Sequence, residues 1–390
     1  MTRSRRNFLA SGLALPVVAN ATRSEQEPQT PAKPQRPVTP RSSAPELRYK
    51  VLGKTGLKVT TIGFGCMITS DGSVVERAAD LGITYFDTAR NYQSGNNERM
   101  VGAALKKKRK DIVLSTKTEG RDKAEALAQL DTSLKELGTD FVDIWYLHAK
   151  AKPEDVSDGL LEAQQIARKA GKIRFAGVST HNAELVPFLA KNPNVEVILA
   201  QYNFSMPPLM GQVIDEAFKA GKGIVAMKVM AGGFRRPQPG NLTQEKLKRD
   251  GAMLAALKWV LRNPSVHTTI PSMTDMDQLD ENLRAFSQPF GAADEKLLAL
   301  QLDHIRPLYC RMCGECAGQC RQGLPVSDVL RFLSYADGYG QFGLGRERFL
   351  QLDAAHTAVR CTECPSCTVR CPYGVHVAQR LIRAQDLFAC

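Results

Sequence analysis

GITYFDTARNY, residues 82–92, places a short β-prone segment directly before a group of polar side chains. Within it, TYFDTA (84–89) is rich in β-branched and aromatic residues, which favour strands. Asp87 ends the apolar part, and Tyr92 follows five residues later. Carboxylates and phenols both take part in proton transfer. The stretch therefore predicts a strand whose carboxyl end carries chemistry.

Seven further segments of this kind lie between residues 58 and 286, and they alternate with longer helical patterns. Such alternation is typical of βαβ units around a parallel sheet. Eight units within about 230 residues fit a closed barrel better than an open doubly wound sheet, and no G-x-G-x-x-G fingerprint follows the first strand. We therefore predict a (β/α)8 TIM barrel with strands at 59–66, 84–89, 112–117, 142–148, 173–180, 195–203, 223–229 and 267–273.

Polar side chains stand at the carboxyl ends of these predicted strands. In barrels of this type the reactive groups lie at those ends and in the loops that follow. The residues found there are Asp87, Lys117, His148, Ser179, Gln201 and Lys228, with Tyr92 in the loop after the second strand.

Several segments resemble motifs of the aldo-keto reductase superfamily, in the family's order. LGKTGLKVTTIGFGC resembles its first strand and hairpin lead-in, GITYFDTARNY its Gly-x-x-x-Phe-Asp-Thr-Ala motif and tyrosine, GKIRFAGVST its fifth strand, and LDENL its signature after the eighth strand. The resemblance covers roughly residues 48 to 288. It implies a nicotinamide-dependent reductase of small carbonyl or alcohol substrates with a tetrad of Asp87, Tyr92, Lys117 and His148.

Carbonyl reduction needs a proton donor and groups that control its charge, which Tyr, Lys, Asp and His can supply. Hydride addition leaves charge on the carbonyl oxygen, which must be protonated as it forms. Tyr92 can donate that proton if its pKa is lowered, and an ammonium at Lys117, held by Asp87, would favour the phenolate. His148 would direct the carbonyl oxygen toward Tyr92. Taken singly, these groups are also compatible with a structural ion pair, a rim aromatic and a hydrogen-bonded core histidine.

The resemblance also implies the cofactor contacts. Ser179 and Gln201 would hydrogen-bond the nicotinamide amide, and the loop after the first strand would line the site with Gly65, Cys66 and Met67.

Three positions depart from the family pattern. Thr180 stands where members commonly place asparagine after the serine, and Met227, next to Lys228, stands where many place an aromatic ring to stack on the nicotinamide. Ser272 and Gln278 stand where a lysine or arginine would often meet the 2′-phosphate of NADP.

These departures leave the choice between NADP and NAD open. Without a cation the 2′-phosphate loses its charge-assisted bonds, and Asp275 and Asp277 stand nearby with the wrong sign. Glu281 and Asn282 match the family's adenine-contacting pair, so a pyridine dinucleotide is still expected.

The last ninety residues have a different composition, with ten arginines, no lysine and nine of the ten cysteines. Eight of those cysteines form two C-x2-C-x2-C-x3-C runs, CRMCGECAGQC (310–320) and CTECPSCTVRC (361–371), the second followed by proline. Helix-like spacing fills the segment between the runs. Four disulfides or two zinc sites are the competing interpretations.

The doubled run resembles the bacterial ferredoxin pattern for two 4Fe-4S clusters. The resemblance implies that the fourth cysteine of each run binds the other run's cluster. We therefore expect one cluster on Cys310, Cys313, Cys316 and Cys371, and a second on Cys361, Cys364, Cys367 and Cys320.

The chain begins with a segment that resembles a twin-arginine signal peptide. Arg5 and Arg6 precede an apolar run and the small-x-small site Ala19-Asn20-Ala21. This predicts a signal over 1–21 and export of the folded protein, hence a periplasmic location. A linker rich in Pro, Gln, Ser and Thr over 22–45, a barrel over 46–295 and a small helix-rich ferredoxin-like domain over 296–390 would follow.

Neither the net charge nor the hydropathy of the chain identifies a further binding partner. The net charge of +12 falls to about +9 without the signal's three arginines. The basic run KKKRK (106–110) lacks interleaved aromatic residues, so a solvated helix end is favoured over nucleic-acid binding. No apolar run reaches the roughly 20 residues that span a bilayer, so no integral membrane segment is expected after signal removal.

The sequence leaves open how the predicted barrel and the predicted ferredoxin-like domain act together. A nicotinamide gives up two electrons as hydride, whereas a cluster passes one at a time, so the hydride step itself does not need the clusters. The clusters would relay electrons to a redox protein partner, dock that partner, or hold the C-terminal domain together. The competing class is an electron-transfer or interaction protein whose barrel binds nucleotide without turnover.

Overall fold

The computed structural model describes residues 46–232 and 242–389, which fall within one compact unit, Ala44–Cys390. The predicted signal peptide (1–21), the predicted linker (22–45) and Cys390 lie outside the described residues.

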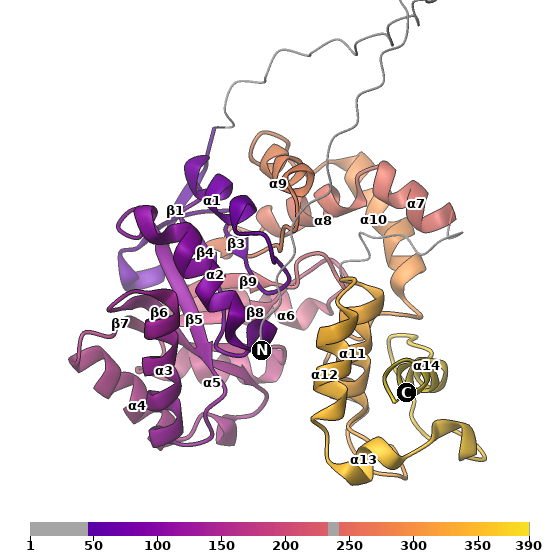
Figure 1. The fold of residues 1–390 in the computed structure, drawn as a ribbon. Helices are drawn as coiled ribbons and strands as arrows, with labels where there is room; N and C mark the ends of the chain where they lie inside the picture. The colour runs from indigo at the N-terminus through magenta and orange to yellow at the C-terminus, as the bar shows by residue number, and fades with distance from the viewer. Residues whose placement is uncertain (1–45, 233–241, 390) are drawn as a thin grey trace, which may run out of the picture. The chain divides into compact units, whose positions relative to one another are not determined.

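Eight parallel strands form one sheet in the order β10-β9-β8-β7-β6-β5-β4-β3. Each predicted strand is present: β7 has the predicted bounds, β6 is two residues longer, and the others are shorter or slightly shifted. An isolated parallel bridge between Ile62 and Thr269 brings the two edges together, so the sheet is a nearly closed barrel, as predicted (Figure 1). The strands are β3 (Phe64–Gly65), β4 (Tyr85–Asp87), β5 (Val113–Thr118), β6 (Val142–Lys150), β7 (Ile173–Thr180), β8 (Val197–Gln201), β9 (Gly223–Met227) and β10 (Thr268–Thr269).

The first predicted strand, 59–66, is divided in the structure. Its start belongs to β2 (Lys58–Thr60), which pairs antiparallel with β1 (Tyr49–Val51), and only β3 joins the barrel. This hairpin packs against the amino end of β9, where a Cβ on Gly53 would lie 2.4 Å from the amide nitrogen of Gly223. Close backbone approach at φ +54° explains the glycine at position 53.

The interior of the barrel is filled by side chains. Leu52, Leu57 and Val59 of the hairpin pack with inward residues of the strands. Tyr85 and Tyr146 share a hydrogen bond of 2.8 Å across the interior. The hairpin and these inward side chains fill the barrel at the amino ends of the strands. The accessible face is therefore the one at the carboxyl ends of the strands.

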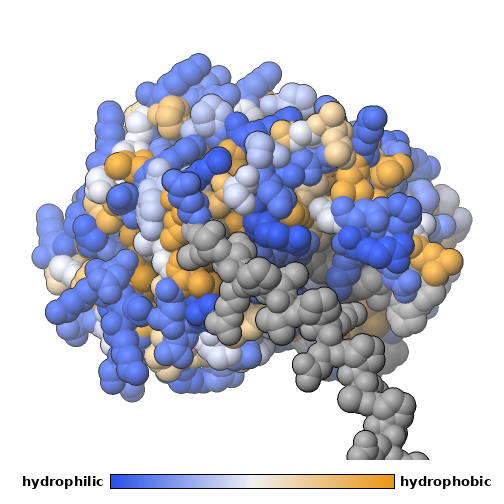
Figure 2. Space-filling view, turned by 90° about the horizontal axis from the view of Figure 1, so that it is seen from above, coloured by the Kyte–Doolittle hydropathy of each residue, from blue (hydrophilic) through white to orange (hydrophobic). Residues whose placement is uncertain are grey.

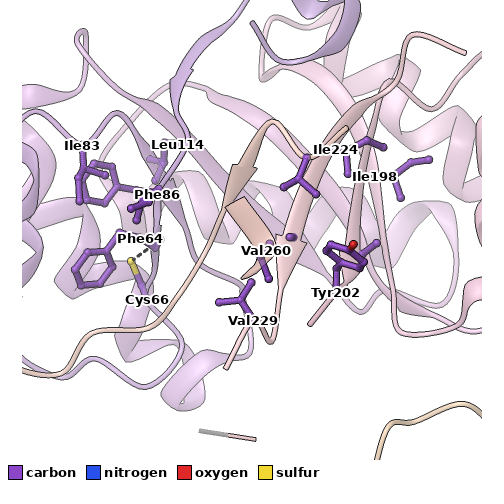
Figure 3. Close-up of a cluster of buried hydrophobic side chains, with 14 of the residues drawn as sticks. Phe64, Cys66, Ile83, Phe86, Leu114, Ile198, Tyr202, Ile224, Val229 and Val260 are labelled. Atoms are coloured by element: carbon purple, nitrogen blue, oxygen red, sulfur yellow. Dashed lines mark hydrogen bonds between the residues drawn. The ribbon is translucent and has the colours of Figure 1, made fainter. Parts of the chain in front are cut away.

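Helices cover the outside of the barrel and bury a second layer of apolar side chains against the strands. Figure 3 shows part of this layer, with Phe64, Phe86 and Leu114 in one group and Ile198, Ile224 and Val260 in another. The helices are α1 (Gly72–Asp80), α2 (Asn96–Leu105), α3 (Lys123–Leu137), α4 (Asp158–Lys169), α5 (Val186–Lys191), α6 (Pro208–Lys219), α7 (Leu242–Arg249), α8 (Ala252–Leu261), α9 (Met276–Leu283) and α10 (Ala292–Ile305).

The C-terminal region is helix-rich, as predicted, and has its own core. Phe349 and Phe388 meet there with ring centroids 5.7 Å apart, and Leu333 is fully buried. Its helices are α11 (Val326–Asp337), α12 (Phe342–Leu350), α13 (Ala354–Ala358) and α14 (Val377–Phe388), with both cysteine runs in irregular segments or short turns around them.

The helices α11 and α12 lie against the barrel. At the end of α11 a Cβ on Gly338 would come within 1.9 Å of the carbonyl oxygen of Gly232, in the loop after β9. Gln341 donates a hydrogen bond to the carbonyl of Ile68 (3.4 Å), and Ser94 lies 3.3 Å from Glu347. Glycine at 338 is therefore required by contact and not by its own torsion angles.

The surface is predominantly polar. On the face shown in Figure 2, hydrophilic side chains predominate and hydrophobic ones gather only in small groups. In the basic run, Arg109 pairs with the buried Asp143 at 2.9 Å and lies over the ring of Phe141. Across residues 46–232 and 242–389, no helix combines the length and the apolar character that crossing a membrane requires.

We expect Gly338→Ala to lower the thermal midpoint of unfolding, because the new methyl group collides with the backbone of the barrel loop. The matched control is Gly343→Ala in α12, where a Cβ would meet nothing within 4 Å and alanine should stabilise the helix by about 0.5 to 1 kcal/mol. Differential scanning calorimetry of both variants tests the contact. Equal midpoints for the two would contradict it.

Candidate active site

Asp87 and Lys117 form a buried ion pair between neighbouring strands. Asp87 ends β4 and pairs in register with Ser115 of β5, whose hydroxyl donates to Asp87 Oδ1 at 2.7 Å. Lys117 Nζ lies 2.5 Å from Asp87 Oδ2 and 2.6 Å from the carbonyl oxygen of Thr88. Burial disfavours both charges, raising the pKa of Asp87 and lowering that of Lys117, while their mutual attraction opposes both shifts.

Tyr92 begins the short helix η2 (Tyr92–Gly95) and packs over this pair. Lys117 Nζ lies 4.8 Å from the centroid of the Tyr92 ring, over its face. The pKa of Tyr92 is raised well above 10, first by burial and then by the nearby Asp87. The prediction of a lowered pKa was therefore wrong. The ammonium faces the ring and is already paired with a carboxylate, so the phenol of Tyr92 is neutral at physiological pH.

His148, near the end of β6, faces Tyr92 edge-on, with ring centroids 5.8 Å apart. Its Nδ1 lies 3.5 Å from Glu119 Oε1 and has no hydrogen-bond partner among the described residues. Burial, with the positive charges of Lys117 and Arg331, holds the pKa of His148 well below 6.5. The imidazole is therefore neutral at physiological pH and able to donate to an oxygen atom.

The four predicted catalytic residues surround one cavity of about 300 Å³, which is large enough for a small organic ligand. One wall is the carboxyl end of the barrel, and the other is α11 and α12. The predicted site residues that line it are Gly65, Met67, Asp87, Tyr92, Lys117, His148, Met227, Lys228, Ser272 and Gln278.

The remaining predicted cofactor residues, Cys66, Ser179, Thr180, Gln201, Glu281 and Asn282, do not line the cavity. Ser179 accepts a hydrogen bond from the amide of Ala149 (2.7 Å), and Gln201 Nε2 donates to the hydroxyl of Tyr309 (2.9 Å). Glu281 and Asn282 belong to α9.

One feature of the barrel, the side-chain oxygen of Gln201, fits a nicotinamide group. The side-chain oxygen of Gln201 is buried and has no hydrogen-bond partner among the described residues, so it is available to an amide donor. A Cβ on Gly65 would lie 2.5 Å from the carbonyl oxygen of Ile270, so this loop has room only for glycine. Gln278 is already bonded to Thr274 through its amide nitrogen.

The helices α11 and α12 form a roof over the cavity that the sequence analysis did not identify. Arg331, Tyr335 and Tyr339 project from α11 and the turn after it, and Arg348 projects from α12. The four-residue spacing of Arg331, Tyr335 and Tyr339 was the available signal in the sequence, because residues four apart lie on one face of a helix. Their position over the barrel depends on tertiary contacts and is not encoded in the spacing.

Lys228 connects the barrel to the roof. It follows β9 with a positive φ of 54°, and its Nζ lies 5.5 Å from the ring centroid of Tyr335 and 5.6 Å from that of Tyr339. Burial and the nearby positive charges of Arg331 and Lys117 lower its pKa to about 7. Lys228 therefore stands in the cavity as an amine that exchanges its proton near neutral pH, and no carboxylate among the described residues pairs with it.

None of the eight clustered cysteines forms a disulfide with another described residue. The pKa of Cys310 is raised to about 12, first by burial and also by its thiol neighbours Cys316, Cys313 and Cys371. Burial likewise raises the pKa of Cys361 to about 11, and its thiol neighbours are Cys364, Cys320 and Cys367. These neighbours form the two sets of four that the ferredoxin resemblance implies.

The local backbone of the first run also fits a cluster. The amide of Met312 donates to the sulfur of Cys310 at 3.3 Å, as amides do around iron–sulfur clusters. Within the described residues, no three cysteine, histidine or carboxylate side chains meet closely enough to hold a single metal ion.

Comparison with known proteins divides the chain between the barrel and the cysteine-rich C-terminal region. Residues 69–298 match the aldo/keto reductase family, and residues 307–375 match a 4Fe-4S dicluster domain. The uncharacterized oxidoreductase YqkF of Bacillus subtilis (strain 168) is 27% identical over 67% of this chain and 98% of its own. L-glyceraldehyde 3-phosphate reductase of Escherichia coli O157:H7 is 24% identical over 64% of this chain and 90% of its own.

Among solved structures, the holo form of an aldo-keto reductase from Bacillus halodurans is similar, with 28% identity and a TM-score of 0.57. The match covers 65% of this chain and 96% of that one.

We expect Lys228→Met to raise the free energy of unfolding more at pH 6.5 than at pH 10. The folded-state pKa of about 7 lies below the ordinary value of 10.5, so the unfolded chain binds the extra proton between these values. The cost of the buried charge is therefore complete below pH 7 and fades as pH rises toward 10.5. Urea denaturation at both pH values measures it, with Lys219→Met, an exposed lysine on α6, as the control.

Proposed function

The chain belongs to the aldo-keto reductase family and carries a C-terminal 4Fe-4S domain, and from this premise we propose that it transfers hydride between a nicotinamide cofactor and a small carbonyl or alcohol compound. One observation carries the proposal. Asp87, Tyr92, Lys117 and His148 come from four separate segments and surround a single cavity. The Escherichia coli relative is named for reducing an aldehyde, which agrees in reaction type.

The proposed mechanism assigns one task to each residue. When bound, a nicotinamide would supply hydride to the carbonyl carbon or accept it from the alcohol. The neutral imidazole of His148 donates a hydrogen bond to the carbonyl oxygen and orients it toward Tyr92. Tyr92 donates its proton as negative charge develops on that oxygen.

Lys117 and Asp87 stabilise the state that follows. Proton donation leaves a phenolate at Tyr92, and the ammonium 4.8 Å from the ring centroid offsets that charge. Asp87 holds Lys117 in place through the 2.5 Å contact. Removal of the carboxylate would leave a buried ammonium without its partner, which costs several kcal/mol.

The cofactor we propose is NAD or NADP, with the nicotinamide amide at Gln201 and Ser179 and its ring near Met227. The free side-chain oxygen of Gln201 supports this placement. Gln278 is bonded to Thr274 and Asp275, and no cationic side chain stands at its position. This argues for a weak preference between the two dinucleotides.

We propose that the C-terminal domain holds two 4Fe-4S clusters, one on Cys310, Cys313, Cys316 and Cys371 and the other on Cys361, Cys364, Cys367 and Cys320. The segment from Cys320 to Cys361 carries both roof helices, and its two ends are ligands of the same proposed cluster. Cluster binding would therefore fix the roof over the cavity by closing this loop. Export of the folded protein by the twin-arginine route, proposed from residues 1–21, would suit a cofactor assembled in the cytoplasm.

We expect Tyr92→Phe to reduce carbonyl turnover by at least about a hundredfold, because the loss of a general acid costs this much or more. Nucleotide affinity should stay within about twofold, since the hydroxyl is assigned to the substrate oxygen. Turnover over a panel of aldehydes and ketones, with nucleotide binding followed by fluorescence, tests the role. A wild-type chain that binds nucleotide but reduces nothing would favour the electron-transfer alternative.

Anaerobically purified protein should contain about eight iron atoms and eight acid-labile sulfides per chain. Cys313→Ser and Cys364→Ser each remove one ligand from a different set, so each should lower the iron content to about four. Cys66→Ala is the control, because this buried thiol belongs to the barrel and to neither set. Four irons in the unaltered chain would leave one cluster and overturn the assignment.

A further inference from the structure

The cavity carries more positive than negative charge. Lys228, Arg331 and Arg348 line it in addition to Lys117, whose charge is offset by Asp87. Among the described lining residues, the other carboxylate is Glu119, which lies 3.5 Å from Arg348. An excess of cations in a partly buried cavity favours a negatively charged ligand.

Several of these groups have hydrogen-bonding capacity that the protein leaves unused. Arg331 Nε is buried and lacks a hydrogen-bond partner among the described residues, although its NH2 group pairs with Asp328 at 2.7 Å. Lys228 Nζ faces the rings of Tyr335 and Tyr339. Buried polar groups are ordinarily satisfied, so a bound anion would supply acceptors that are otherwise lacking.

We propose that the roof recognises an anionic group, a carboxylate or phosphate, on the carbonyl substrate, with Arg331 and Lys228 as its ligands. The proposal rests on the proposed function and names the substrate class for the same cavity. Arg348 adds charge at the neighbouring helix α12. The aromatic side chains of the roof would cover the apolar body of the substrate.

The substrate, and not the cofactor, is the favoured source of the anion. Arg331 belongs to α11, whereas the match to the reductase family ends at residue 298, so the family's barrel does not supply it. Of the positions predicted for the adenine half of the dinucleotide, Ser272 and Gln278 line the wall formed by the barrel, and Glu281 and Asn282 do not line the cavity. The phosphates of the dinucleotide are the alternative source of the same chemistry.

The test compares 4-carboxybenzaldehyde with its methyl ester, using the cluster-containing protein and saturating nucleotide. We expect the carboxylate to be preferred in kcat/KM by at least about tenfold, and Arg331→Gln to lower that ratio to near one, because it removes a charge-assisted hydrogen bond. Arg306→Gln is the matched control. It breaks an i,i+3 pair with Asp303 of the same kind, away from the cavity, and should leave the ratio unchanged.

A second readout separates failure of this proposal from failure of the proposed function. Calorimetric binding of the same two compounds gives the preference without turnover, so a chain that reduces neither still answers the question. Nucleotide affinity is measured in parallel. A ratio near one in the unaltered chain, or an Arg331→Gln change that weakens nucleotide and leaves the ratio intact, overturns the proposal; the latter assigns Arg331 to the dinucleotide phosphates.

Cluster absorbance and circular dichroism show whether Arg331→Gln folds. If it does not, Arg348→Gln takes its place and should lower the ratio by a smaller factor, because its charge is shared with Glu119. An unchanged ratio in a folded Arg348→Gln protein would then contradict the proposal.

Discussion

The buried pair of Asp87 and Lys117 is the interaction on which the site depends. A lone ammonium or carboxylate in this interior would pay a large desolvation penalty, and the 2.5 Å contact offsets it only because β4 and β5 are neighbours in register. Tyr92 packs over the ammonium and His148 faces Tyr92. The geometry of the barrel thus fixes the charge of Lys117 and, through it, the surroundings of Tyr92 and His148.

Burial has opposite consequences for the two halves of the cavity. On the barrel side it keeps Tyr92 and His148 neutral, by raising one pKa and lowering the other, and neutral groups can donate hydrogen bonds and a proton. On the roof side Arg331 keeps its charge because a guanidinium does not deprotonate in proteins. Protonation chemistry and anion recognition can therefore coexist in one small cavity.

The C-terminal region contributes directly to the cavity. Its first two helices close the cavity, Tyr309 contacts Gln201 one residue before the first cysteine run, and Gly338 meets the barrel backbone. The C-terminal region and the barrel thus meet at shared contacts. With the clusters placed as proposed, loss of iron would release the loop that carries α11 and α12 and so change the cavity.

The sequence by itself determined the repeating strand and helix pattern, the polar residues at the strand ends and the two cysteine runs, because each is written in local spacing. The eightfold barrel and the convergence of Asp87, Tyr92, Lys117 and His148 followed from that pattern, since parallel strands end at one face. Three features were decided by the tertiary structure alone. The first predicted strand divides at the hairpin, the pKa of Tyr92 is raised by burial, and Arg331 faces the cavity. Each depends on which distant segments pack together, and residue spacing carries no information about packing or about the water it excludes.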